Sequence, residues 1–76
     1  IMGIVVQNPA WLLTAAEVAV LLSISESALA ALRRAGGVPE PVRLGHEVRW
    51  RAAEIRDWIR AGTPPASVWR WKQDGR

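Results

Sequence analysis

Two capped helical patterns separated by only three residues constrain the fold more than any other feature of this sequence. In the first pattern, Thr14 and Glu17 have the spacing of a capping box, in which each side chain accepts a hydrogen bond from the other residue's backbone amide. Leu13 precedes the box with the spacing of a hydrophobic staple to Val18. The apolar residues that follow have the periodicity of one buried face: Val18, Leu21 and Leu22. This pattern predicts a helix over about residues 15–22.

The second pattern starts at Ser25, a favoured N-cap residue, and Ile24 and Leu29 repeat the staple spacing. Two leucines then have core spacing, and two arginines fall in the last turn before a glycine stop: Leu29, Leu32, Arg33, Arg34 and Gly36-Gly37. We predict a helix over about residues 26–35. A helix, a three-residue link and a second helix have the dimensions of a helix-turn-helix, which offers its second helix to the major groove of DNA.

A short hairpin is predicted next, after Pro39-Glu40-Pro41 forces the chain to become extended. Two β-prone triplets, 42–44 and 48–50, flank Gly45-His46-Glu47, which we read as the turn. We expect the apolar side chains on one face of this hairpin and the arginines on the other: Val42, Leu44, Val48 and Trp50 against Arg43 and Arg49. Such a hairpin would be a wing with guanidinium groups on its outer side.

A third helix is predicted over about residues 52–61, with Gly62 ending it. Ile55, Trp58 and Ile59 form its apolar stripe, while Glu54 and Asp57 are expected on the exposed side. The predicted fold is therefore mainly α with a small β-hairpin, a winged helix-turn-helix. We assign an N-terminal arm with a short strand at Ile4-Val5-Val6, the DNA-binding domain and a C-terminal tail: residues 1–11, 12–62 and 63–76.

The core is expected to form around two tryptophans, because the chain has no Phe or Tyr to supply bulk. Trp50 and Trp58 should pack with aliphatic residues of all three helices: Val18, Leu22, Leu29 and Ile55. Trp11 is assigned to packing as well. Trp69 and Trp71 leave three alternatives: a protein interface held away from the body by Pro64-Pro65, stacking on a base, or docking on the body itself.

Length and composition exclude several functional classes. A chain of 76 residues forms at most one domain and buries only about 60% of its unfolded surface, so a large substrate cleft is not expected. It has no Cys and one His, so we expect no disulfide, metal site or cofactor. No apolar run approaches the roughly 20 residues that span a bilayer, and we expect a cytoplasmic protein without membrane contact. Ser25 and Ser27 lack a recognisable His and carboxylate partner, so we expect no enzymatic activity.

The charge distribution favours a polyanionic partner. Residues 1–32 carry only the acids Glu17 and Glu26, whereas residues 33–76 carry all ten Lys and Arg against five acids. A basic half of this kind suits DNA, because each neutralised phosphate releases condensed counterions. Two local explanations stay open. Arg33 and Arg34 could simply neutralise a helix C-terminus, and the hairpin arginines could pair with Glu40 or Glu47.

The run from Leu12 to Arg60 resembles the excisionase and AlpA-like family of winged-helix proteins, which are related to the MerR DNA-binding domain. Three stretches carry the resemblance, in the family's order and spacing over about two thirds of the chain: LLTAAEVAVLLSIS at 12–25, GGVPEPVRLGHEVRW at 36–50 and AEIRDWI at 53–59. The resemblance implies that the second helix enters the major groove and that the wing lies beside the phosphates or in the minor groove. Phage members are recombination directionality factors that bind adjacent sites, bend DNA and help an integrase to excise a prophage. Other members regulate transcription.

The resemblance also assigns roles to individual residues. Ser25 and Ser27 match the start of the family's recognition helix, Arg34 its basic end, and Arg43 and Arg49 its wing arginines. Trp50 matches the core residue between wing and third helix. Several positions depart from the family pattern, which predicts weak base reading: Glu26, Ala30, Ala31 and Glu47. The predicted DNA-binding residues are Thr14, Ser25, Glu26, Ser27, Ala30, Arg33, Arg34, Arg43, His46, Arg49 and Arg51.

These features predict an architectural DNA-binding protein of the excisionase class. Its expected partners are double-stranded DNA, further copies of itself on DNA and a tyrosine or serine integrase. Two alternatives remain: a small transcription regulator using the same surface, and a protein-interaction adaptor whose active part is the tail with Trp69 and Trp71.

Overall fold

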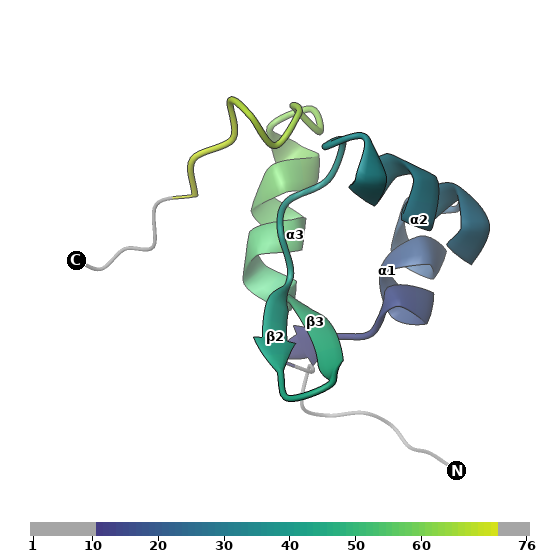
Figure 1. Cartoon of the computed structure of the whole chain (residues 1–76). Coiled ribbons are helices and arrows are strands. Elements are labelled where there is room, and N and C mark those ends of the chain that lie inside the picture. Colours follow the sequence, from purple (N-terminus) through teal and green to yellow (C-terminus); the bar gives the residue numbers. More distant parts are fainter. Residues whose placement is uncertain (1–10, 72–76) are drawn as a thin grey trace, which may run out of the picture.

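The computed structural model describes residues 11–71, so the strand predicted at Ile4-Val5-Val6 lies outside the described residues. It contains three helices and three short strands: β1 (Leu12–Leu13), α1 (Ala15–Leu22), α2 (Glu26–Arg34), β2 (Val42–Leu44), β3 (Glu47–Arg51) and α3 (Ala52–Arg60). Figure 1 shows α1 and α2 on one side of the molecule and α3 on the other, with the β2–β3 hairpin below them. This is the predicted fold, mainly α with a small antiparallel sheet, in winged helix-turn-helix order.

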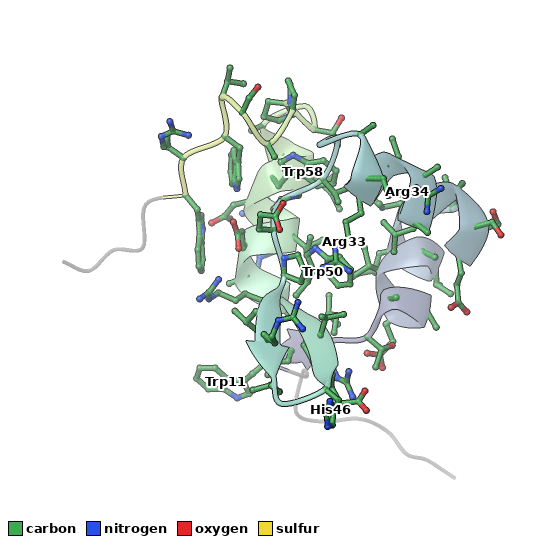
Figure 2. The ribbon with its side chains drawn as sticks, viewed as in Figure 1. Trp11, Arg33, Arg34, His46, Trp50 and Trp58 are labelled. Carbon is green, nitrogen blue, oxygen red and sulfur yellow. The ribbon has the colours of Figure 1, made fainter. Side chains whose placement is uncertain are left out.

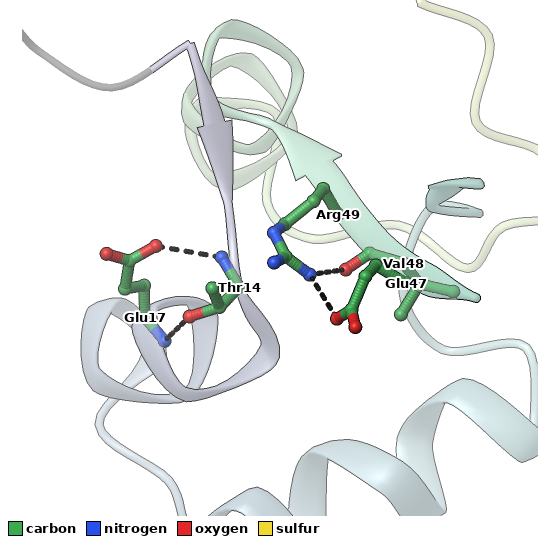
Figure 3. A network of polar contacts seen from close by, with 5 residues as sticks. All are labelled: Thr14, Glu17, Glu47, Val48 and Arg49. Carbon is green, nitrogen blue, oxygen red and sulfur yellow. Dashed lines mark hydrogen bonds and ion pairs between the residues drawn. The ribbon is translucent and has the colours of Figure 1, made fainter. Parts of the chain in front are cut away.

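The caps predicted for α1 and α2 are present. The Oγ1 atom of Thr14 accepts from the Glu17 amide at 3.1 Å, and the Thr14 amide donates to Oε1 of Glu17 at 2.8 Å (Figure 3). Ser25 Oγ accepts from the Ala28 amide at 3.0 Å. Ser23 adopts a left-handed conformation, with φ 59°, and ends α1. The chain bends by 99° between α1 and α2, within the range of helix-turn-helix motifs.

The sheet contains one strand that was not predicted, and its order is β1-β3-β2. Leu12 lies opposite Arg51 and Leu13 opposite Trp50, so the residues leading into α1 pair with the far strand of the hairpin. Leu13 thus belongs to a strand and also packs against the core.

The hairpin has a two-residue turn, because Leu44 pairs directly with Glu47. Gly45 has φ 62° and the following His46 does not have a positive φ, the arrangement of a type II′ turn with glycine at its first central position. The predicted three-residue turn is therefore wrong by one residue.

This one-residue difference also overturns the predicted faces of the hairpin. Arg43 lies opposite Val48, and Val42 lies opposite Arg49. Since residues opposite one another point to the same side of a sheet, Arg43 shares the face of Val48 and Trp50, whereas Arg49 points to the other side. A shift of one residue in register reverses the side chains of one strand relative to its partner.

The core is the predicted single cluster. Its buried members come from all three helices, the hairpin and the α2–β2 link: Val18, Ala19, Leu29, Val38, Trp50, Ile55 and Trp58. Leu22 is partly buried and packs against them. The indole N–H of Trp50 donates to the Pro39 carbonyl at 2.8 Å, which satisfies the polar atom of this buried side chain.

Five apolar side chains predicted to pack are exposed instead. They are Trp11 at 89%, Leu21 at 56%, Leu44 at 51%, Ile59 at 40% and Leu32 at 38%. The buried residues of α1 are Val18 and Ala19, on the side of the helix that contacts α2 and β3. Leu21 lies at the edge of this side and is exposed. Periodicity identifies a broad apolar stripe on the helix, but the positions of the neighbouring elements determine which residues of that stripe become buried.

The tail packs on α3 as far as it is described, so the expectation that Pro64-Pro65 hold it away from the body is wrong for residues 63–71. The Trp58 indole donates to the Pro64 carbonyl at 2.7 Å, and the Ala66 amide donates to the Gly36 carbonyl at 2.9 Å. Trp69 packs against the core cluster. The docking alternative therefore describes this segment.

Glu54 and Asp57 anchor the tail, which corrects their expected exposure. The Trp69 indole donates to Oε2 of Glu54 and the Trp71 indole to Oδ2 of Asp57, each at 2.9 Å. Glu54 is buried, and Asp57 is half-buried. Because each indole N–H has an acid as hydrogen-bond acceptor, the tryptophan rings can bury the face of α3 that carries these acids and would otherwise be exposed to solvent.

No single helix of the described residues has the length and apolar character to cross a membrane. Only α1 and α2 taken together pass that test, and the chain is bent by 99° between them.

Candidate nucleic-acid interface

The outward face of α2 consists mainly of small side chains. Four exposed residues recur at positions i, i+3, i+4 and i+7, away from the buried Leu29: Ser27, Ala30, Ala31 and Arg34. In a helix-turn-helix, the N-terminal part of the second helix approaches the base edges. The stripe can approach DNA closely, and its only guanidinium lies at the C-terminal end of α2.

The predicted hydroxyl contacts at the helix starts are already used in caps. Thr14 and Ser25 each accept a backbone hydrogen bond, and each hydroxyl keeps its own proton for donation. Ala15, next to Thr14, lines a groove beside α2. The start of α1 and the start of α2 therefore border the same surface.

This groove lies between α2 and the hairpin and has a volume of about 500 Å³. Its lining joins residues from α1, α2, β3 and the link before β2: Ala15, Glu26, Leu29, Ala30, Arg33, Arg34, Glu40, Val48 and Trp50. Four of the eleven predicted DNA-binding residues line it: Glu26, Ala30, Arg33 and Arg34. A fifth, Thr14, directly precedes the lining residue Ala15.

Arg33 occupies the inner side of the groove rather than the outward stripe. Its guanidinium carbon lies 6.0 Å from the centre of the Trp50 ring, a cation–π distance, and the side chain is half-buried. Figure 2 shows Arg33 reaching from α2 toward Trp50, while Arg34 points outward. Stacking on a buried ring restricts the orientation of Arg33, whereas Arg34 is exposed.

The two wing arginines do not act as a pair. Arg43 is exposed on the hairpin face that it shares with the groove-lining Val48. Arg49 lies on the other face, where one guanidinium nitrogen is 3.2 Å from Glu47 Oε1 and 2.7 Å from the Val48 carbonyl (Figure 3). Pairing with Glu47, one of the two local alternatives, is confirmed for Arg49. His46 is exposed in the turn between the strands.

Arg51 contacts α3 and the tail. Its guanidinium lies 3.5 Å from Glu54 and 5.9 Å from the centre of the Trp71 ring. The structure therefore divides the predicted site residues. The surface of α2, the groove and the turn of the hairpin hold most of them, while Arg49 and Arg51 take part in contacts elsewhere.

Glu40, expected from the sequence only as an ion-pair partner of the hairpin arginines, is a groove residue. It is exposed, lines the groove across from α2, and makes no ion pair with any of residues 11–71. Its neighbours Pro39 and Pro41 indicated an extended link but not which way the side chain faces. Within the described residues, no three His, Cys, Asp or Glu side chains are grouped so that they could hold a metal ion.

Comparison with known proteins agrees with this geometry. The family model described as a helix-turn-helix domain matches residues 12–63, about two thirds of the chain, including all three helices and the hairpin. No curated protein and no solved structure matches significantly. The chain therefore belongs to the helix-turn-helix domain family of small DNA-binding proteins.

Proposed function

We propose that this protein is an architectural DNA-binding protein of the excisionase class. It places α2 in the major groove and the hairpin against the backbone, binds adjacent sites cooperatively, bends the DNA and directs a tyrosine or serine integrase toward excision. The observation that carries the proposal is the outward stripe of α2, where Ser27, Ala30 and Ala31 leave little side chain for reading bases.

A stripe of this kind favours recognition of DNA shape. Arg34 and Arg43 lie on the side of the groove and make no ion pairs within residues 11–71, so both are available to phosphates. Phosphate contacts fix orientation and register but carry no sequence information, so specificity must come from few base contacts and from DNA deformability.

Cooperative binding would compensate for the small size of the domain. A single module of this size buries about 600–1,000 Å² on DNA, which limits the affinity of one copy. Binding of several copies to adjacent sites raises the occupancy of each, and a row of bound copies can hold a bend that one copy cannot.

Footprinting of the full chain on candidate attachment-site DNA, at several salt concentrations, tests the proposal. We expect adjacent protected segments that fill together, faster gel migration when the binding site is moved from the middle of the fragment to its end, and affinity that falls with salt. An excision assay with the integrase encoded nearby then separates an excisionase from a transcription regulator. Protection at a single promoter site, without bending or stimulation of excision, would favour the regulator.

The adaptor alternative loses its main support in the structure. Trp69 and Trp71, which would form its binding surface, are half-buried and donate their N–H groups to Glu54 and Asp57 of α3. Absence of salt-dependent DNA binding by the full chain would restore that alternative.

A further inference from the structure

Two acidic side chains at the candidate interface make no hydrogen bond or ion pair within residues 11–71, and the position of one of them, in the first turn of α2, suits the helix dipole but does not require a side chain that faces DNA. Residues 11–71 contain six acids, and four of them make hydrogen bonds or ion pairs: Glu17, Glu47, Glu54 and Asp57. Glu26 and Glu40 make neither within this part of the chain, and both line the groove between α2 and the hairpin. A carboxylate beside a DNA-binding surface repels phosphates, so its presence there requires an explanation.

Glu26 differs from Glu40 in its position on the recognition helix. It is the first residue of α2 and is exposed, at the end of the helix that approaches base edges. The other outward side chains of the first two turns are serine or alanine, and Arg34 lies eight residues further along, about 12 Å by helical rise. Glu26 is thus the only long polar side chain exposed in the N-terminal half of α2, and it lies beside the outward stripe, on the side of the groove.

We propose that Glu26 is a specificity-determining residue that accepts a hydrogen bond from the N4 amino group of a cytosine in the major groove. The inference rests on the proposed DNA-binding function. A carboxylate is an acceptor only, and cytosine offers a donor at its major-groove edge. The amino group of adenine is a weaker match, because the neighbouring N7 is itself an acceptor and repels a carboxylate.

The same charge disfavours incorrect sites. On a sequence without the cytosine, Glu26 remains close to the phosphates and gains no hydrogen bond in return. Specificity then comes from attraction at the correct base pair together with repulsion at the others. This explains how an α2 surface of small residues can still distinguish one base pair.

Selection of bound duplexes from a pool with a randomised core tests the proposal, using the full chain and three variants. Glu26→Ala removes the acceptor, and Glu26→Gln keeps the length but changes the chemistry, because glutamine pairs with the N6 and N7 atoms of adenine. Glu40→Gln is the matched control, since it neutralises an exposed, unpaired carboxylate on the opposite side of the same groove. Circular dichroism checks that each variant is folded.

The parent chain should select cytosine at one position, with a preference of roughly five- to tenfold or more. Glu26→Ala should lose the preference at that position alone and bind unselected duplexes more tightly, while Glu26→Gln should shift the preference to adenine. Glu40→Gln should keep the cytosine. A preference that survives in Glu26→Ala, or that Glu40→Gln also removes, overturns the inference. So does salt-dependent binding without any base preference, which leaves the DNA-binding function intact, whereas no binding by the parent chain overturns both.

Discussion

Arg34 and Arg43 are the side chains on which phosphate binding depends most in our proposal. Both are exposed on the side of the groove, whereas Arg49 lies on the other hairpin face and contacts Glu47. We predict that Arg34→Ala and Arg43→Ala each weaken binding to all duplex sequences and reduce the slope of log affinity against log salt by about one unit. Arg49→Ala should have a smaller effect on both quantities.

Fluorescence anisotropy titrations of a labelled duplex at several salt concentrations measure these changes. The sequence alone places Arg43 and Arg49 on the same face of the hairpin, so the comparison also tests the hairpin register. A larger effect of Arg49→Ala than of Arg43→Ala would contradict the assignment of the hairpin faces.

Two tryptophans of opposite exposure give a matched test of the core. Trp58 is 2% exposed and donates to the Pro64 carbonyl, whereas Trp11 is 89% exposed. Trp58→Ala should lower the free energy of unfolding by about 3–5 kcal/mol, which is comparable to the whole stability of many domains of this size. Trp11→Ala should leave it nearly unchanged. Urea denaturation followed by circular dichroism measures both, and a normally stable Trp58→Ala variant would show that this ring is not part of the core.

At the scale of elements, the tail behaves as a cover for α3. Truncation after Gly62 removes Trp69 and Trp71 and leaves Glu54 with only its contact to Arg51. We predict a lower melting temperature for the truncated chain, because buried apolar surface and satisfied polar groups become exposed. Cooperative binding to an array of adjacent sites should persist at temperatures where the truncated chain is folded.

A double variant separates the contribution of the two indole hydrogen bonds to stability from the contribution of the apolar rings. Trp69→Phe with Trp71→Phe keeps most of the apolar cover but loses both N–H donors, so its melting temperature should fall between those of the full and truncated chains. The interface hypothesis for the tail predicts the reverse pattern, in which truncation abolishes array cooperativity without changing the melting temperature or single-site affinity.

At the scale of the whole molecule, the uneven charge limits how many phosphates one copy can neutralise. Of the eight arginines in residues 11–71, three make ion pairs, namely Arg49, Arg51 and Arg60. Two more, Arg56 and Arg70, lie on α3 and in the tail, away from the groove and the hairpin. If Arg33, Arg34 and Arg43 contact phosphates, the slope of log affinity against log salt should be about −3 for one copy on a short duplex. Binding measured from low to moderate salt checks this value. A slope near zero, or one of twice this size, would show that a different surface binds DNA.

The three helices could be predicted nearly to the residue because their boundaries are set locally. The Thr14–Glu17 box, the Ser25 cap and the glycines at 36 and 62 act within about one turn of the helix ends, and the structure contains all of them. Most of the core was also predictable. Trp50 and Trp58 are the fully buried aromatic residues among residues 11–71, and Val18, Leu29 and Ile55 of the three helices pack with them.

The candidate site could be predicted only in part, because side-chain orientation depends on contacts distant in sequence. Arg33 and Arg34 are adjacent in the chain, yet one stacks on Trp50 and the other points outward. The sequence does not show this difference, because it arises from where Trp50 of β3 lies relative to α2.

The sequence by itself therefore determined the caps of α1 and α2, the approximate helix boundaries and the two central tryptophans of the core. The caps depend on residues a few positions apart, and the chain has no Phe or Tyr that could replace the tryptophans. The tertiary structure alone decided the hairpin register, the pairing of β1 with β3 and the docking of Trp69 and Trp71 on α3. A one-residue change in turn length alters register and reverses the side chains of one strand. A residue at the edge of a helix face, such as Leu21 or Glu54, becomes buried only if a segment distant in the sequence packs against it. The local periodicity of the helix does not indicate which segment that is.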